Sequence, residues 1–296
     1  MKRARGWLDG LLVDPLDLRM RGIKGKKKLV EQLDAYYRLW RVAAPEEKPL
    51  ILERIRQVVA LTYEDRYHDM ASISDQWFKE DATSYLRAAV VMERLGLDTA
   101  RYREEIEKIH PRLDEQMKSR GPHQRRVFHW YYQHFGLREP FPLESALAQG
   151  LIAARRDPGT MSTLDVYNLT HEVFVPYEFG DRLDVDPFTD QDKKYLRGAL
   201  QVLSDRYIKE DNADLLAELV ECLHYLRLSD LTIYRAGVLY LMTKQNPDGS
   251  WGIYLVQRRR YGDYAKQGFQ LHTTLVAIAA LTAVFDLPMP PPGARL

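Results

Sequence analysis

The stretch that decides the fold is Gln245-Asn-Pro-Asp-Gly-Ser-Trp-Gly252. Pro247 fixes the φ angle that a tight turn needs, and the two glycines tolerate positive φ angles that other residues avoid. About twenty residues later comes the run 271–285, fifteen residues without a charge. A helix that is apolar on every side is normally buried on every side, and this one is too short to cross a bilayer. The two segments predict a turn followed by a central helix, with His272 near the start of that helix.

Most of the remaining chain shows the i, i+3, i+4 apolar spacing of amphipathic helices. Before residue 160 this spacing predicts helices over 29–40, 50–63, 82–95 and 102–117. An aromatic run over 127–135 carries His129 and His134, and helical spacing of aromatic residues is typical of core packing. The alternative is that His123, His129 and His134, with Trp130, Tyr131 and Tyr132, line a cavity. Few segments alternate as half-buried strands do, so the predicted fold class is all-α.

Three later segments look alike, each a polar turn or loop next to an apolar helix: 163–174, 214–228 and 271–285. His171, Glu218 and His272 fall at comparable depth in these helices and are separated by 47 and 54 residues. If the three helices form one inner layer, these ligand-type side chains point into one cavity.

The pattern Gln-x-x-Asp-Gly-Ser-Trp-Gly, a loop, and a buried helix opening on His-Thr resembles a repeat unit of the α/α toroids. That superfamily includes triterpene cyclases, protein prenyltransferase β subunits and, more distantly, lanthionine cyclases. The resemblance is specific over 235–287, weaker over 160–230, and before residue 160 rests on helical pattern alone. It implies one domain over 1–296, a closed double ring of about five or six hairpins, with 1–28 as a candidate N-terminal extension. It also implies that the Trp ring and the Gln side chain of the turn tie neighbouring hairpins together.

The leading site hypothesis is a metal ion held by His171, Glu218 and His272. Imidazole nitrogen and carboxylate oxygen suit Zn²⁺ or Fe²⁺, and three protein ligands leave a position open for substrate. Cys222 lies one helical turn beyond Glu218 on the expected same face and is either a further ligand or, as the favoured interpretation, a plain buried thiol. The resemblance implies zinc binding at the His272 position, although prenyltransferases space their Asp and Cys ligands two apart and this chain does not. On the same helix, Glu221 and His224 are expected further round, toward its polar side.

Two further carboxylates are candidates for catalysis. Glu172 follows His171 and could orient it or act as a base. Asp184-Val-Asp186-Pro187 is one carboxylate short of the Asp-x-Asp-Asp acid of class II terpene cyclases, which leaves Asp184 as a candidate acid. Two-domain triterpene cyclases are also about twice this length, so an ordinary squalene-type cyclase is not expected.

Composition narrows the remaining classes. The 296 residues carry 43 Lys and Arg against 42 Asp and Glu, so no global charge favours nucleic acid. Lys24, Lys26, Lys27 and Lys28 are interpreted as a solvated turn before a helix, and Arg258–Arg260 as a solvated loop with phosphate binding as the alternative. The single cysteine excludes an internal disulfide. Without a signal-like or membrane-spanning run, the expected compartment is the cytoplasm.

Together these patterns predict a toroid enzyme with a metal-centred site that acts on a small molecule or a peptide, as in natural-product biosynthesis. One alternative is a non-catalytic toroid that binds an isoprenoid, a peptide or a partner protein. The other is a metal-free cyclase or lyase that uses Glu172 or Asp184 as its acid or base.

Overall fold

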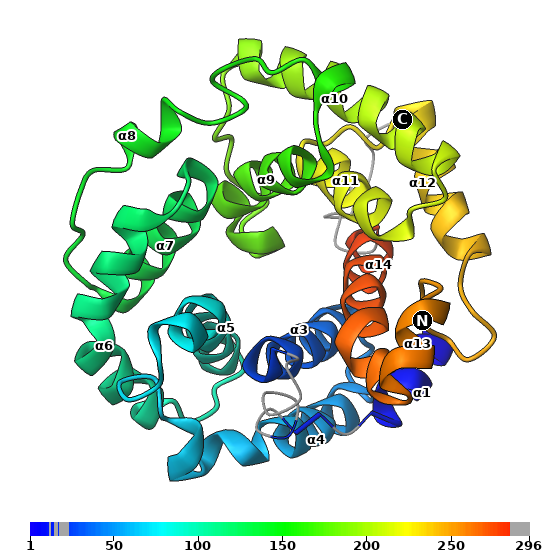
Figure 1. Ribbon diagram of the computed structural model, residues 1–296. Helices are drawn as coiled ribbons and strands as arrows, with labels where there is room; N and C mark the ends of the chain where they lie inside the picture. Colours follow the sequence, from blue (N-terminus) through cyan, green and yellow to red (C-terminus); the bar gives the residue numbers. More distant parts are fainter. Residues whose placement is uncertain (12, 15–16, 18–23, 285–296) are drawn as a thin grey trace.

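The computed structural model describes residues 1–11, 13–14, 17 and 24–284. Within these residues the chain is helical and contains no β-strand, which confirms the all-α prediction. Six helices contact one another in cyclic order and surround a central space (Figure 1). In chain order they are α3 (Gly25–Val42), α5 (Asp75–Arg94), α7 (Pro122–Phe135), α9 (Thr163–Phe174), α11 (Ala213–Tyr225) and α14 (Leu271–Ala283).

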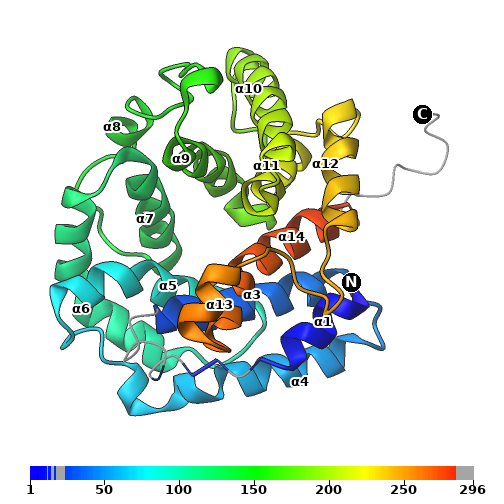
Figure 2. The same cartoon turned by 45° about the vertical axis from the view of Figure 1, so that its right-hand side comes forward.

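A second set of helices lies outside these six (Figures 1 and 2). It comprises α4 (Lys48–Val59), α6 (Ala100–Ser119), α8 (Glu144–Leu147), α10 (Asp190–Lys209), α12 (Thr232–Thr243), α1 (Lys2–Asp9) and α13 (Leu255–Tyr261). Short helical turns connect them: η1 (Ala60–Tyr63), η2 (Asp65–Tyr67), η3 (Pro158–Thr160), η4 (Val175–Gly180) and the π-type turn η5 (Lys266–Gln270). The outer helix α4 packs on α3, α6 packs on α5 and α7, and α10 and α12 pack on α11.

The helices expected to carry the site form where the sequence predicts them. Helix α9 has the predicted bounds, and its N-terminus is closed by a reciprocal capping box between Ser162 and Asp165. In α11, every residue from Asp214 to Tyr225 is buried. Helix α14 is buried along most of its length, as its uncharged sequence predicts, while residue 285 lies outside the described residues. The first 160 residues supply α3, α5 and α7, so they contribute to the same ring of contacts.

The turn at 245–252 joins α12 to α14 through its tryptophan. The buried Trp251 ring donates from Nε1 to the carbonyl of Leu241 at 2.7 Å, and its backbone N–H donates to Thr274 Oγ1 at 3.1 Å. The Gln245 amide instead donates within the turn, to the Gly249 carbonyl at 3.0 Å. Trp251 therefore links α12 to α14, whereas the hydrogen bond of the Gln245 side chain lies within the turn.

The N-terminal helix α1 is packed against this turn and against α3. Trp7 and Leu8 are buried in the common core, and Gln32 of α3 donates to the Leu8 carbonyl at 3.3 Å. Gly249 has φ +98°, and a Cβ atom built there would lie 2.2 Å from the Arg3 carbonyl oxygen. The first residues of the chain thus depend on a close backbone approach that glycine permits.

The lysine cluster differs from its prediction as a solvated turn. Lys26 and Lys28 lie in the first turns of α3 and are buried. Lys26 Nζ lies 2.9 Å from Asp69 Oδ1, and Lys28 Nζ lies 2.6 Å from Glu31 Oε2. The solvated interpretation is wrong for these two lysines because α3 begins earlier than apolar periodicity indicates.

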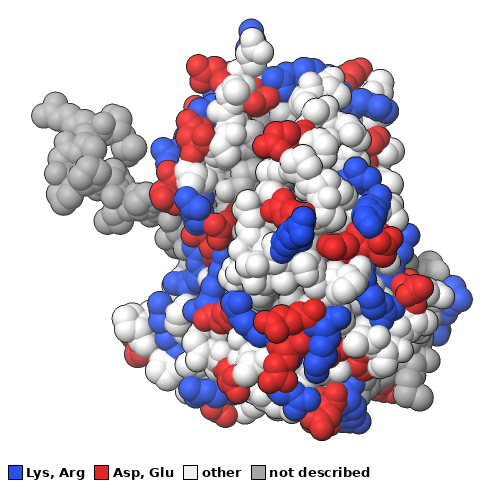
Figure 3. All heavy atoms as spheres, turned by 90° about the vertical axis from the view of Figure 1, so that its left-hand side faces the viewer, with Lys and Arg blue, Asp and Glu red and all other residues white. Residues whose placement is uncertain are grey.

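Acidic and basic side chains are interspersed over the face formed by α6, α7 and α8 (Figure 3). Arg258–Arg260 are exposed on α13, a short helix rather than a loop. Among the described residues, no helix combines the length and the apolar character that a membrane crossing requires.

We expect Gly249→Ala to lower the free energy of unfolding by about 2–3 kcal/mol, because the alanine would occupy a strained positive φ and meet the Arg3 backbone. Gly198→Ala is the matched control. Gly198 lies inside α10 with open space at its Cβ position, so this change should stabilise the protein by up to about 1 kcal/mol. Urea denaturation measures both. Equal effects of the two substitutions would contradict the packing of α1 on the turn.

Candidate functional site

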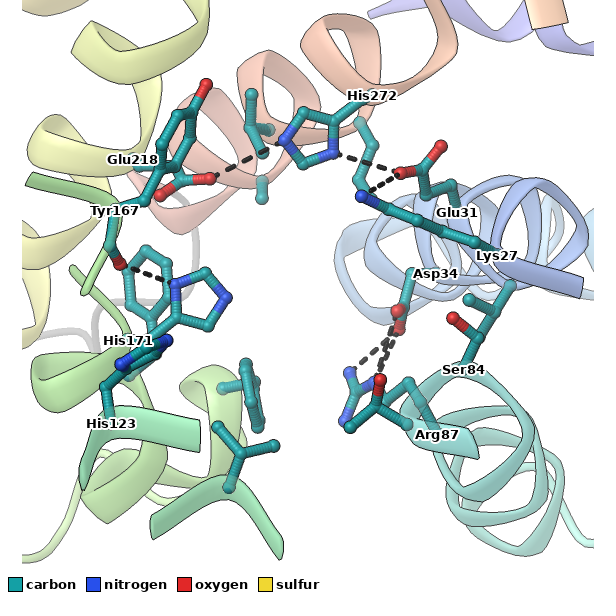
Figure 4. A pocket seen from close by; sticks show the side chains of 18 of the residues that line it. Lys27, Glu31, Asp34, Ser84, Arg87, His123, Tyr167, His171, Glu218 and His272 are labelled. Atoms are coloured by element: carbon teal, nitrogen blue, oxygen red, sulfur yellow. Dashed lines mark hydrogen bonds and ion pairs between the residues drawn. The ribbon is translucent and has the colours of Figure 1, made fainter. Parts of the chain in front are cut away.

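A cavity of about 630 Å³ lies at the centre of the six helices. All six contribute to its wall, for example through Glu31, Arg87, His123, His171, Glu218 and His272 (Figure 4). Its size suits a small molecule or a few residues of a peptide. No single helix supplies the wall, so the candidate site is a product of the tertiary fold.

His272 lies in a cluster of carboxylates at the junction of α3, α11 and α14. Its Nδ1 is 3.2 Å from Glu31 Oε1, and its Nε2 is 3.6 Å from Glu218 Oε1 and 3.7 Å from Asp214 Oδ2. Burial alone would lower the pKa of His272, but the negative charges of Asp214, Glu218 and Glu31 outweigh it and raise the pKa to about 10. His272 is therefore an imidazolium at neutral pH.

The carboxylates around His272 have further partners. Glu31 forms ion pairs with Lys28, at 2.6 Å, and with the half-exposed Lys27, at 3.6 Å. Burial would raise the pKa of Glu31, yet the charges of these lysines and of His272 hold it well below its usual value. Glu218 accepts a hydrogen bond from the Thr170 hydroxyl at 2.6 Å. Its pKa is also lowered, since His272 and His171 outweigh the effect of burial.

The third carboxylate, Asp214, accepts hydrogen bonds from the Thr273 hydroxyl at 2.7 Å and from the Tyr167 hydroxyl. The Tyr167 contact connects α9 to α11, and the Thr273 contact connects α11 to α14. Asp214 therefore fixes the helix that carries Glu218 relative to the helix that carries His272.

His171 presents one ring nitrogen to the cavity. Its Nδ1 lies 2.8 Å from the carbonyl oxygen of Tyr167, and because a carbonyl only accepts, Nδ1 must carry the hydrogen. In the neutral ring, Nε2 then holds the lone pair, and Figure 4 shows it turned toward the cavity. Among the described residues, Nε2 makes no hydrogen bond. This arrangement fixes both the orientation and the tautomer of the imidazole.

Two arginine–carboxylate pairs, each with a buried arginine, complete this part of the wall. Arg87 binds Asp34 through Nη2 at 2.8 Å and through Nε at 3.1 Å. Arg38 Nη2 lies 3.3 Å from Glu221 Oε1, and the Tyr225 hydroxyl donates to the same oxygen. Burial raises the pKa of Glu221 despite the opposing charge of Arg38.

Three of the four predicted metal ligands, His171, Glu218 and His272, line this one cavity. Cys222 does not join them. It is fully buried with Sγ 3.9 Å from the Thr170 carbonyl, and burial raises the pKa of its thiol well above the usual value, which disfavours the thiolate that binds metals. In the described part of the chain, no three His, Cys, Asp or Glu side chains are arranged to hold one ion. Both nitrogens of His272 face carboxylates, so in this arrangement neither nitrogen is directed at a shared centre with His171.

The two predicted catalytic carboxylates lie away from the central cavity. Glu172 is buried and accepts hydrogen bonds from the backbone N–H groups of Leu151 and Ile152 at 2.8 and 3.1 Å. It lines a second cavity of about 470 Å³ next to Arg126. Asp184 is exposed, in the loop before α10. Neither side chain is among those that line the cavity with His171.

Four of the six histidines and aromatic residues considered for a cavity around 123–134 are divided between the two cavities, and two line neither; of these two, Tyr132 donates to Asp114 at 2.7 Å. His123 and Tyr131 line the central one, His129 and Trp130 line the second, and His134 binds Glu93 at 2.8 Å. The expected position of Glu221 and His224 on a polar side of α11 is wrong. Both are buried, Glu221 lines the central cavity, and burial lowers the pKa of His224 to about 4.

Sequence reasoning missed the acidic and basic residues that α3 contributes. Lys27, Glu31, Asp34 and Arg38 follow one another at spacings of four, three and four, and all four line the cavity. That spacing places them along one face of a helix. A charged stripe beside an apolar face such as that of Leu29, Leu33 and Tyr36 is usually interpreted as solvated, and no local pattern in the sequence marked this stripe as part of a cavity wall.

Residues 24–282 match the model of a family described as a domain of unknown function (DUF6895). Since the match spans most of the 296 residues, the chain belongs to this family. No curated protein and no solved structure matches the chain.

The charge on His272 makes the stability of the protein depend on pH. A pKa raised from about 6.5 to about 10 stabilises the folded state fully below pH 6.5, and this contribution is lost as the pH rises toward 10. We expect the free energy of unfolding to fall over this interval in the wild type. In His272→Gln it should be about 3 kcal/mol lower at pH 6.5, because buried carboxylates lose their countercharge, and it should fall less with pH.

Denaturation at pH 6.5, 8 and 9.5 measures both effects. His110→Gln is the control, because His110 lies on the outer helix α6 and bonds to the carbonyl of Arg138. In His110→Gln the free energy of unfolding should fall with pH as it does in the wild type. Parallel pH curves for the wild type and His272→Gln would show that His272 is not held protonated by its neighbours.

Proposed function

We propose that the chain is an α/α toroid enzyme that binds a small polar molecule or a short peptide in the central cavity and transfers a proton through His171. The observation that carries this proposal is the fixed tautomer of His171, whose Nε2 faces the cavity without a partner among the described residues. The cyclic contacts of six inner helices and the Trp251 turn support the toroid class.

The roles follow from what each group can donate or accept. His171 Nε2 takes a proton from a C–H, O–H or N–H group of the bound molecule and later returns it, as a general base and then acid. The bond from Nδ1 to the Tyr167 carbonyl stabilises the imidazolium that forms in between. Base-catalysed isomerisation, elimination and cyclisation begin with such a transfer, so the proposed reaction class is proton abstraction coupled to one of these.

His272 and its carboxylates act as a fixed polar surface in the wall of the same cavity as His171. Because Glu31, Glu218 and His272 hold one another in their charged forms, they bind polar groups without rearrangement during the reaction. A pKa near 10 makes His272 a poor proton donor at neutral pH. We therefore assign it to positioning and electrostatic stabilisation, and His171 to proton transfer.

Metal binding is the second candidate, favoured by the meeting of His171, Glu218 and His272 in one cavity. Metal binding would require the His272 ring to lose its proton and to turn away from Glu31. A bound Zn²⁺ or Fe²⁺ would supply Lewis-acid chemistry there. No step of the proposed proton transfer depends on it.

The test of the proposed function is conversion of a metabolite. Purified protein is incubated with a small-molecule extract, and the compounds consumed and formed are identified by mass spectrometry. We expect His171→Gln to lower the rate of that conversion by at least about 100-fold, because glutamine cannot exchange a proton. His110→Gln, on the outer helix α6, should retain the full rate. Conversion by His171→Gln at the wild-type rate would exclude His171 as the base, and absence of conversion would favour a binding protein.

Chelation distinguishes the two candidates. Proton transfer by His171 predicts that conversion survives dialysis against EDTA, with metal content measured in parallel by elemental analysis. The metal site would be supported over acid–base chemistry by two results together. One is stoichiometric zinc or iron that is lost in His171→Ala and retained in Cys222→Ala, and the other is loss of conversion after chelation. Cys222 is the matched control because it is buried outside the cavity.

A further inference from the structure

Three arginines line the central cavity and are more than nine-tenths buried, and one of them differs from the others. Arg38 lies 3.3 Å from Glu221 and Arg87 lies 2.8 Å from Asp34. Arg120 is 7% exposed, and no carboxylate of the described residues lies within 4.0 Å of its guanidinium. It is the cavity arginine that lacks an internal countercharge in the described part of the chain.

The partners of Arg120 are all neutral. Its guanidinium donates to the Lys79 carbonyl, to Gln124 Oε1 at 3.3 Å and to Gln116 Oε1 at 3.5 Å, while its buried Nε–H has no acceptor. Burial lowers the pKa of Arg120, and no neighbouring charge offsets this effect. A buried charge without a countercharge is costly, so this position is destabilising unless an anion completes it.

The residues beside Arg120 suit an anion. His123 and Gln124 follow it at the start of α7 and line the same cavity, as do Thr83 and Ser84 of α5. Burial, and then the nearby His171 and Arg120, lower the pKa of His123 to about 4. His123 is thus neutral at neutral pH and can donate one N–H without adding a charge that needs compensation. No described residue forms a hydrogen bond with it.

We propose that Arg120, His123 and Gln124 form an oxyanion subsite that binds a carboxylate or phosphate group of the molecule held in the cavity. This inference rests on the proposed function of the same cavity and defines its substrate class as an anionic small molecule or a peptide with a free carboxylate. The cations around His272 are already paired with Glu31 and Glu218, so an anion binds at Arg120 instead, and the subsite also sets the orientation of the bound molecule. Its anionic group lies toward Arg120, and its reacting atom lies toward His171, which lines the same cavity from the neighbouring helix α9.

The experiment titrates the full-length protein with inorganic phosphate and, separately, with acetate, at constant ionic strength in chloride. The Cε1–H NMR signals of the eight histidines report binding, and His123→Gln identifies the signal of His123. We expect a saturable shift of that signal and a rise in the melting temperature of the wild type. Tighter binding of phosphate or of acetate identifies which oxyanion the subsite prefers.

Arg120→Gln should weaken binding of the preferred anion at least about tenfold, since a charge-assisted hydrogen bond is lost. Arg125→Gln is the matched control. Arg125 is the next arginine along the chain, it likewise donates to carbonyls, those of Met117 and Lys118, and it does not line the cavity. It should bind the anion within twofold of the wild type. If Arg120→Gln does not fold, Arg120→Met replaces it, because a straight apolar chain preserves the packing on Phe128.

Two results would overturn the subsite: no saturable shift in the wild type up to 50 mM of either anion (on the order of the weakest specific binding), or a folded Arg120 variant that binds like the wild type. The two proposals fail separately. Conversion that depends on His171 without anion binding would refute only the subsite, whereas Arg120-dependent anion binding without conversion would refute only the enzymatic role.

Discussion

The ion cluster around His272 is the interaction on which the rest of the site depends. Helix α14 lies between α3 and α11, and His272 is the residue through which it contacts carboxylates of both. Glu31 and Glu218 are 187 residues apart in the chain, yet one imidazolium separates their carboxylates. Each carboxylate is buried at a cost that only a nearby positive charge offsets. Helix α14 therefore supplies, through His272, a positive charge that the buried carboxylates of α3 and α11 require.

The same requirement for charge balance holds the cavity open. A space of this size lined by apolar side chains alone would be lost by collapse, because each side chain gains by packing on its neighbours. Here the wall contains ion pairs such as Arg87 with Asp34 and Arg38 with Glu221, which are held at fixed positions by bidentate or shared hydrogen bonds. Moving either pair inward would break those bonds in a medium of low dielectric. The cavity is therefore preorganised before any molecule enters it.

The sequence predicted the helical class, the bounds of α9, the turn at 245–252 and the common cavity of His171, Glu218 and His272. These predictions succeeded because turn chemistry and apolar periodicity are local properties. The partner of His272 on α3 was missed because no local pattern says which distant helix will face it. Glu221 was misplaced for a related reason: a helix that is buried on all sides has no polar face, so its charged residues must be paired internally.

Cys222 illustrates the limit of helical spacing as a guide to a site. Residues four apart differ by about 40° around the helix axis, which is enough to turn Sγ toward the Thr170 carbonyl while Glu218 remains in the cavity wall. Similarly, Glu172 follows His171 by one position and is turned by about 100°, so it faces the amides of Leu151 and Ile152 instead. Because His171 and Glu172 are adjacent in the sequence, they were predicted to act together. The helix geometry instead directs their side chains to different cavities.

The nature of the wall also discriminates between classes of bound molecule. An isoprenoid chain would cover the apolar side chains, such as Phe174 and Leu275, but it would also remove water from Arg38, Arg120 and the carboxylates opposite them. Each charged group so covered without a hydrogen-bond partner costs several kcal/mol, of the order gained by burying one or two apolar side chains. A molecule that carries both polar groups and an apolar body satisfies both parts of the wall. The proposed preference for a polar metabolite over a lipid therefore rests on the charged groups in the wall, because apolar side chains also line the cavity.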